Sequence, residues 1–150
     1  MRPWRPKFDS VVGMLMAPRN DGFESLGRIL VIDDEADVVE VVSVYFSGSG
    51  YEVIGATQAG DGLMLADIHR PDLVLLDIMM PGVGGIEALQ QFHLRWPDLP
   101  VIMLTAVANL DTARGALKRG AFDYVQKPFE WEHLERVVGA ALMAGSLRGR

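Results

Sequence analysis

Short apolar runs alternate with longer segments of helical period from residue 28 onward. Four of the runs are rich in Val, Ile or Leu and show little polar alternation, which is typical of strands covered on both faces. Runs of this kind that alternate with helices indicate a parallel sheet with crossover connections. We therefore predict strands in the runs Ile29–Ile32, Tyr51–Ala56, Leu73–Leu76, Val101–Leu104 and Tyr124-Val125.

The segments between these runs have the period and the stop signals of helices. From Trp131 to Leu142, apolar residues recur at the spacing of one helix face. Gly48, Pro71 and Gly120 stand where helices commonly end. The predicted helices cover residues 35–47, 60–69, 85–95, 109–119 and 130–145. The predicted fold class is α/β, a single (βα)5 doubly wound five-stranded parallel sheet with helices on both faces.

The 150 residues fit one domain with one core, because 49% are hydrophobic and 23% are charged. Residues 27–146 are predicted to form this domain, with a flexible or loosely docked arm before it (1–26) and a short tail after it (147–150). Basic residues precede an apolar stretch in the arm, as in a signal peptide. However, Asp9 and Gly13 interrupt that stretch and no cleavage site follows.

Charge and cysteine content narrow the function. The net charge of −6 disfavours direct binding to nucleic acid. The absence of cysteine excludes disulfides and thiolate metal sites, and fits a reducing compartment. No apolar run reaches the ~18 residues of a membrane span. We therefore expect a cytoplasmic protein that contacts neither membrane nor nucleic acid directly.

Polar residues stand at the ends of four predicted strands. A single Asp there could merely cap the next helix, but Asp77 follows an apolar strand, where an unpaired carboxylate is costly. Parallel strands end at one edge of a sheet, so three carboxylates would converge and repel one another unless a cation intervenes. Oxygen ligands without Cys or His suit Mg²⁺ or Mn²⁺, which leave room for a phosphoryl group. The strand-end residues are Asp33, Asp34, Asp77, Thr105, Ala106, Lys127 and Pro128.

Four motifs in order resemble the response-regulator receiver domains of two-component signalling, which share a flavodoxin-like fold. The resemblance covers roughly residues 28–145 and identifies 27–146 as a receiver domain. Its motifs are Ile29-Leu30-Val31-Ile32-Asp33-Asp34-Glu35, Leu75-Leu76-Asp77-Ile78-Met79-Met80-Pro81-Gly82, Val101-Ile102-Met103-Leu104-Thr105-Ala106 and Gly120-Ala121-Phe122-Asp123-Tyr124-Val125-Gln126-Lys127-Pro128-Phe129.

The resemblance implies that Asp77 is the phospho-acceptor, which takes a phosphoryl group from a sensor histidine kinase or a histidine phosphotransfer protein. The protein would catalyse only its own phosphorylation and slow dephosphorylation. Asp34 would bind Mg²⁺ directly and Asp33 largely through water, with Asp77 and the backbone carbonyl of Met79 as further ligands. Lys127 would contact the phosphoryl group.

The resemblance also implies a switch. Thr105 would bond the phosphoryl group, Ala106 would leave room for its approach, and Tyr124 would turn inward. The Lys127-Pro128 bond is a candidate cis bond. The fourth helix, fifth strand and fifth helix would then signal to an effector protein or pair with a second copy. Residues offered by that surface are Arg114, Lys118, Arg119, Asp123, Glu135 and Arg136.

Other interpretations stay open. Because only 147–150 follow the last helix, we expect no effector domain here, and the chain is either a stand-alone regulator or an excised receiver of a longer protein. The resemblance implies that the positions of Met79 and Val107 influence how water reaches the aspartyl phosphate, and because both are apolar we expect slow self-dephosphorylation. A metal-dependent phosphohydrolase is one rival, but the sequence offers no evident acid/base for it. A nucleotide-binding module is another, but its only Gly-rich loop, Gly82–Gly85, lacks the final glycine of GxGxxG and is better explained as a flexible loop after Pro81. A degenerate receiver used only as an interaction module conflicts with the intact site residues.

Overall fold

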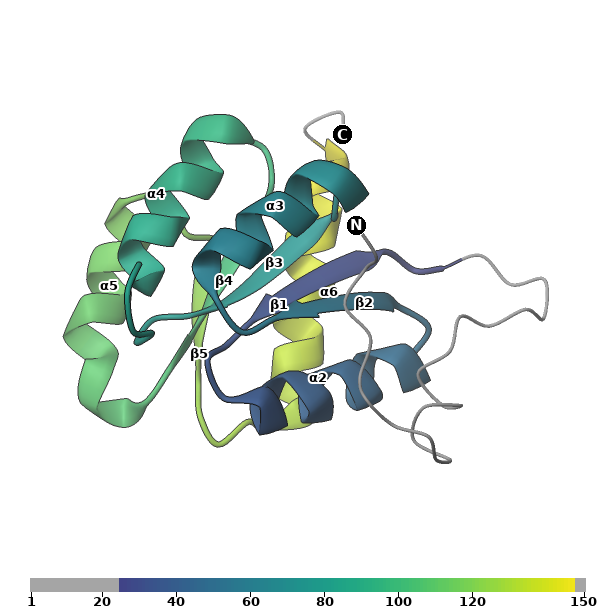
Figure 1. Ribbon diagram of the computed structural model, residues 1–150. Coiled ribbons are helices and arrows are strands. Elements are labelled where there is room, and N and C mark those ends of the chain that lie inside the picture. The colour runs from purple at the N-terminus through teal and green to yellow at the C-terminus, as the bar shows by residue number, and fades with distance from the viewer. Residues whose placement is uncertain (1–24, 148–150) are drawn as a thin grey trace.

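The computed structural model describes residues 25–147, which form one parallel sheet flanked by helices (Figure 1). Most of the predicted arm and residues 148–150 lie outside this part, so the domain boundaries stay predictions. The elements are β1 (Arg28–Ile32), α2 (Ala36–Gly48), β2 (Glu52–Ala56), α3 (Ala59–His69), β3 (Leu73–Asp77), α4 (Gly85–Arg95), β4 (Val101–Thr105), the short 3-10 helix η1 (Val107–Asn109), α5 (Leu110–Lys118), β5 (Asp123–Gln126) and α6 (Trp131–Leu147).

The sheet has the strand order β2-β1-β3-β4-β5, and every neighbouring pair is parallel. The last residues of β1 and β2 pair with each other, Ile32 with Ala56, and Asp77 of β3 pairs with Leu104 of β4. The order reverses between β1 and β3, and ligands of doubly wound sheets bind beside such a switch point. The predicted fold class is confirmed.

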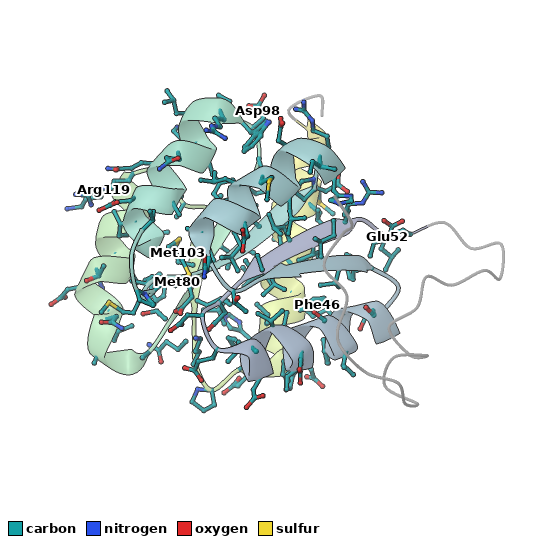
Figure 2. All side chains as sticks on the ribbon, viewed as in Figure 1. Phe46, Glu52, Met80, Asp98, Met103 and Arg119 are labelled. Carbon is teal, nitrogen blue, oxygen red and sulfur yellow. The ribbon has the colours of Figure 1, made fainter. Side chains whose placement is uncertain are left out.

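Alternate residues of each strand face different helices, which explains why the strands read as continuous apolar runs. Leu30 and Leu76 pack toward α3, α4 and α5, whereas Val31 and Leu75 pack toward α2 and α6. Figure 2 shows Phe46 of α2 directed into the second of these layers, where it is fully buried. Both faces of the sheet are therefore covered, and polar residues can gather only at its edges.

The close fit of α3 on the sheet depends on a glycine. A Cβ atom on Gly62 would lie 2.3 Å from Cδ1 of Ile32, far inside contact distance. The helix therefore lies directly on β1 just before the strand reaches the polar edge. Within residues 25–147, no helix is both long and apolar enough to span a bilayer.

Candidate functional site

Four strand ends meet at the carboxyl edge of the sheet and carry the polar residues predicted from the sequence. Asp77 and Thr105 are the last residues of β3 and β4, and Asp33 and Lys127 follow β1 and β5 directly. Backbone hydrogen bonds continue the ladder past the strands, since the Lys127 N–H donates to the Thr105 carbonyl at 2.8 Å and the Asp33 N–H to Ala56 at 3.1 Å. These bonds fix the backbone beneath each side chain.

The three predicted acidic residues form one cluster. Asp33, Asp34 and Asp77 each offer a carboxylate oxygen, and these oxygens lie within 4.8 Å of one another. Asp33 is fully buried, Asp77 is 5% exposed, and Asp34 is exposed. Within the described part of the chain, no other group of three or more His, Asp or Glu side chains comes this close. The histidines therefore form no second metal site there.

Lys127 reaches into this cluster from β5. Its Nζ lies 2.6 Å from Oδ2 of Asp33 and 3.4 Å from Oδ1 of Asp77. Burial lowers the pKa of Lys127, but the hydrogen bond and negative charge of Asp33, together with Asp77, outweigh it, so the pKa is raised overall. Lys127 is therefore a cation at neutral pH. Nothing in the residue pattern predicted that Asp33 would be the nearer partner of Lys127.

The pKa of the Asp77 carboxyl group is raised above its ordinary value. Burial is the main cause that raises its pKa to about 7, followed by the charge of Asp33 and a hydrogen bond with Asp34. Lys127 lowers the pKa but does not offset these effects. One ammonium group thus leaves the three carboxylates undercompensated, and a hard divalent cation would supply the missing charge. The donor set, all oxygen and all acidic, fits Mg²⁺ or Mn²⁺.

Gly85 packs closely against the backbone of Asp77 and Ile78, a contact that the sequence did not reveal. A Cβ atom there would lie 2.2 Å from the carbonyl oxygen of Asp77 and 2.6 Å from Cα of Ile78. The Gly85 N–H donates to the Ile78 carbonyl at 2.9 Å, which ties the start of α4 to the end of β3. The interpretation of Gly82–Gly85 as only a loop after Pro81 therefore missed its last residue. The signal available was a glycine at the first position of a predicted helix.

The predicted switch residues lie beside the cluster. Thr105 is fully buried, and its hydroxyl donates to the carbonyl of Ala106 at 3.0 Å. Tyr124 is half-buried and packs against the core layer of α3, α4 and α5. The Lys127-Pro128 peptide bond is cis. Met79 is 61% exposed; the side chain of Val107 lies outside the described part.

An aromatic stack holds the segment that follows Lys127. The Trp131 ring stacks on Tyr45 of α2 at 4.7 Å between centroids and meets Phe129 edge-on at 5.3 Å. The Tyr45 hydroxyl donates to Oε2 of Glu135 at 2.9 Å. Glu135 therefore contacts α2, so this predicted readout residue is already engaged in a hydrogen bond. Arg114, Lys118 and Arg119 of that surface are exposed.

Fold and site together define a doubly wound α/β domain with an acidic cluster at the carboxyl edge of its sheet. The family model of the response regulator receiver domain matches residues 29–139, so the chain belongs to this family. AtoC of Escherichia coli is 43% identical over 125 residues, which are 83% of this chain and 27% of AtoC. PhoP of Bacillus subtilis is 38% identical over 77% of this chain and 48% of PhoP. The chain thus spans about a quarter to a half of these curated relatives.

Solved structures show the same fold. The receiver domain of NtrX from Brucella abortus superposes with a TM-score of 0.75 at 37% identity, covering 77% of this chain and 98% of that one. A CheY-like receiver domain protein from Methanospirillum hungatei gives a TM-score of 0.78 at 32% identity, covering 83% of this chain and 100% of that one. The expected family membership is confirmed.

Proposed function

We propose that this receiver domain takes a phosphoryl group onto Asp77 from a phosphohistidine of a sensor histidine kinase or a histidine phosphotransfer protein. The observation that carries the proposal is a buried carboxylate held beside two others with one ammonium group between them. Such a cluster is costly to the fold, and strongly perturbed carboxylates of this kind gather at functional sites. Family membership supports the same role.

In the transfer step, a carboxylate oxygen of Asp77 forms a bond to phosphorus while the bond from phosphorus to the imidazole nitrogen breaks. The imidazole leaves with the electron pair of that bond, and the product is an aspartyl phosphate. Lys127, 3.4 Å from Asp77, donates hydrogen bonds to the phosphoryl oxygens. Catalysis here is positioning and charge stabilisation.

Asp33, Asp34 and Asp77 would hold Mg²⁺ or Mn²⁺ together with the backbone carbonyl of Met79. Three acidic oxygens within 4.8 Å of one another fit such an ion. When bound, the cation would neutralise charge on the phosphoryl group. Asp33 already accepts from the Glu35 N–H at 2.9 Å and from Lys127, so a water-mediated role suits it better than a direct one.

Phosphorylation would be read on the surface formed by α5, β5 and α6. Thr105 exchanges its bond to the Ala106 carbonyl for one to a phosphoryl oxygen, the small Ala106 leaves the approach open, and Tyr124 follows the moving loop inward. A shift from 1:99 to 99:1 between two states needs about 5.5 kcal/mol. These bonds, which exist only with the phosphoryl group, supply part of that difference.

The role is that of a cytoplasmic signalling domain, not of an enzyme that turns over an external substrate. Its output is contact with a downstream effector protein or a second copy through the same surface. A net charge of −6 disfavours direct binding to nucleic acid or an anionic bilayer. Apolar, exposed Met79 beside the site fits a slow loss of the phosphoryl group.

Intact-mass spectrometry after incubation with acetyl phosphate and Mg²⁺ tests the proposal. We expect a gain of one phosphoryl group that disappears with chelator and in Asp77→Asn. The matched control is Asp111→Asn, which removes an exposed carboxylate on α5 and leaves the gain intact. A folded protein with no gain under any condition would contradict phosphorylation and favour a phosphorylation-independent interaction module.

A further inference from the structure

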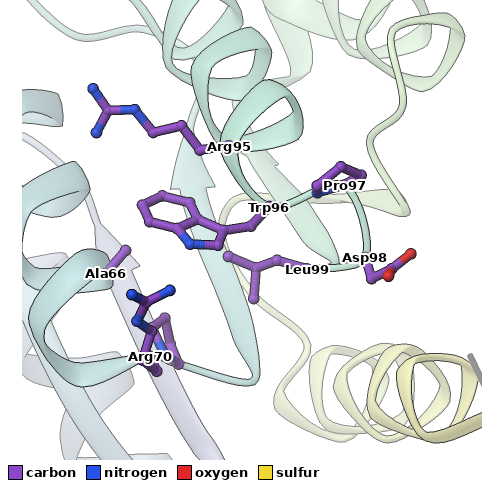
Figure 3. Close-up of a pocket in the computed structure, with 8 residues that line it drawn as sticks. Ala66, Arg70, Arg95, Trp96, Pro97, Asp98 and Leu99 are labelled. Atoms are coloured by element: carbon purple, nitrogen blue, oxygen red, sulfur yellow. The ribbon is translucent and has the colours of Figure 1, made fainter. Parts of the chain in front are cut away.

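A second concave site lies at the opposite edge of the sheet, between the ends of α3 and α4 (Figure 3). Its volume is about 330 Å³, at the small end of the ~300–1,000 Å³ typical of ligand pockets. Pro71 lines it and stands just before β3, whereas Asp77 ends that strand, so the pocket and the acidic cluster lie at opposite ends of β3. The lining residues are Ala66, Arg70, Pro71, Arg95, Trp96, Pro97, Asp98 and Leu99.

The polar groups that line this pocket are mostly hydrogen-bond donors. Figure 3 shows the Trp96 indole between the side chains of Arg70 and Arg95, while the carboxylate of Asp98 points away from the indole. Arg95 lies 6.0 Å from the centre of the Trp96 ring and has no carboxylate partner within the described residues. Two guanidinium groups and an indole N–H favour a ligand that is rich in hydrogen-bond acceptors, such as a phosphate.

Arg70 occupies a backbone position that disfavours it. It follows α3 in the left-handed conformation, with φ of 50°, and is the only residue other than glycine with positive φ among residues 25–147. Glycine or asparagine is the usual choice there. A basic residue would offset the helix dipole from neighbouring positions as well, so the dipole alone does not account for an arginine at this strained position.

Among residues 25–147, one acid, Asp67, competes for Arg70, and it does so weakly. Asp67 lies 3.5 Å from the Arg70 guanidinium, and both side chains are about two-thirds exposed. Exposed pairs of this kind contribute little. A phosphate, by contrast, can take two parallel hydrogen bonds from a guanidinium. The guanidinium group of Arg70 is therefore available to bind an anion.

We propose that this pocket binds a small aromatic phosphate ester of the mononucleotide type. The phosphate binds the guanidinium group of Arg70, Arg95 adds positive charge from the other side of the indole, and the planar base lies against the indole of Trp96 and the side chain of Leu99. Guanidinium groups recognise phosphate, and an indole offers the flat apolar surface on which bases stack. The small volume favours a single nucleotide over a peptide, whose docking buries a wider surface. The site is independent of the phosphorylation of Asp77.

Isothermal titration calorimetry of the full chain with adenosine monophosphate, without metal, tests the proposal. We expect saturable binding at least tenfold tighter than that of adenosine or of inorganic phosphate, because each supplies only half of the contacts. Arg70→Gly weakens binding about tenfold, since a charged hydrogen bond is lost, and Arg95→Gln weakens it by a smaller factor, since only a more distant charge is lost. Arg70→Gly relieves the backbone, so its melting temperature is equal to or above that of the parent.

Arg119→Gln is the matched control, because Arg119 stands at the end of α5 as Arg70 stands at the end of α3. It leaves the affinity unchanged. No saturable heat up to millimolar nucleotide would overturn the proposal. Inorganic phosphate that binds as tightly as the nucleotide would also overturn it, as would equal weakening by Arg119→Gln, because either result would reduce the pocket to general attraction of anions.

Discussion

Charged side chains are buried at one edge of the sheet and exposed to solvent at the opposite edge. At the carboxyl edge, Asp33 and Asp77 are buried and undercompensated, which raises the pKa of Asp77 to about 7. At the other edge, Arg70 is largely exposed and its charge is screened by water. The buried carboxylates at the carboxyl edge therefore lower the stability of the fold, whereas the exposed charge of Arg70 at the other edge hardly affects it. We infer chemistry where charge is buried, and reversible binding where charge stays in water.

The largest expected loss of stability follows from removing the buried ammonium group of Lys127. Lys127→Met leaves the carboxylates of Asp33 and Asp77 without their cation, and breaking a buried pair on one side costs about 3 kcal/mol of unfolding free energy. Urea denaturation without metal measures it. Asp67→Asn, which breaks the exposed pair with Arg70 at the other edge, changes stability by less than about 0.5 kcal/mol. Equal losses would erase the contrast between the edges.

Gly85→Ala is expected to cost about 2 kcal/mol. The added methyl meets the backbone of Asp77 and Ile78, which must shift because neither atom is the end of a flexible side chain. Gly60→Ala is the control, since nothing lies within 4 Å of its Cβ position in α3 and the change favours the helix. Denaturation curves of the two variants should move in opposite directions. An unchanged midpoint for Gly85→Ala would show that the support beneath Asp77 is not rigid.

Mg²⁺ binding should depend on pH through Asp77. The unfolded chain releases this proton near pH 3.8 and the folded protein near 7, so the folded state holds more protons in that window and stability falls as pH rises across it. A cation must displace the proton below pH 7, and its affinity should fall about tenfold per pH unit there. Titration calorimetry at pH 6 and pH 8 measures this, and Asp77→Asn should flatten the dependence.

The smallest expected effect concerns Asp34. Because Asp34 is exposed, Asp34→Asn should change the unfolding free energy by less than about 0.5 kcal/mol while weakening Mg²⁺ binding. Calorimetry and denaturation on one preparation separate the two effects. A stability loss as large as that of Lys127→Met would mean that Asp34 supports the fold instead of serving as a free metal ligand.

The sequence was sufficient for the fold and for the membership of the carboxyl-edge site. Continuous apolar runs located the strands, and parallel strands bring Asp33, Asp77 and Lys127 to one edge. The sequence could not predict which of these side chains would pair, because the 2.6 Å contact of Lys127 with Asp33 depends on side-chain placement. The close approach of Gly85 to Asp77 has no sequence pattern either.

The pocket at the other edge could not be predicted from the sequence. Arg70 and Trp96 belong to different helix ends, and nothing in their spacing indicates contact. An arginine after a predicted helix looks ordinary until its positive φ is known. Sequence patterns therefore predicted the strands, the helices and the strand-end residues that the apolar core positions. They did not predict which residues the loops bring together.

Mapping the phosphoryl group tests the central claim most directly. Borohydride reduces an aspartyl phosphate to homoserine, so peptide mass spectrometry after treatment with acetyl phosphate and Mg²⁺ identifies the acceptor. We predict homoserine at position 77 and at neither position 33 nor position 34, in a yield that falls to background with chelator. Homoserine at another position, or none at 77 in folded protein, would contradict the assignment of Asp77 as phospho-acceptor.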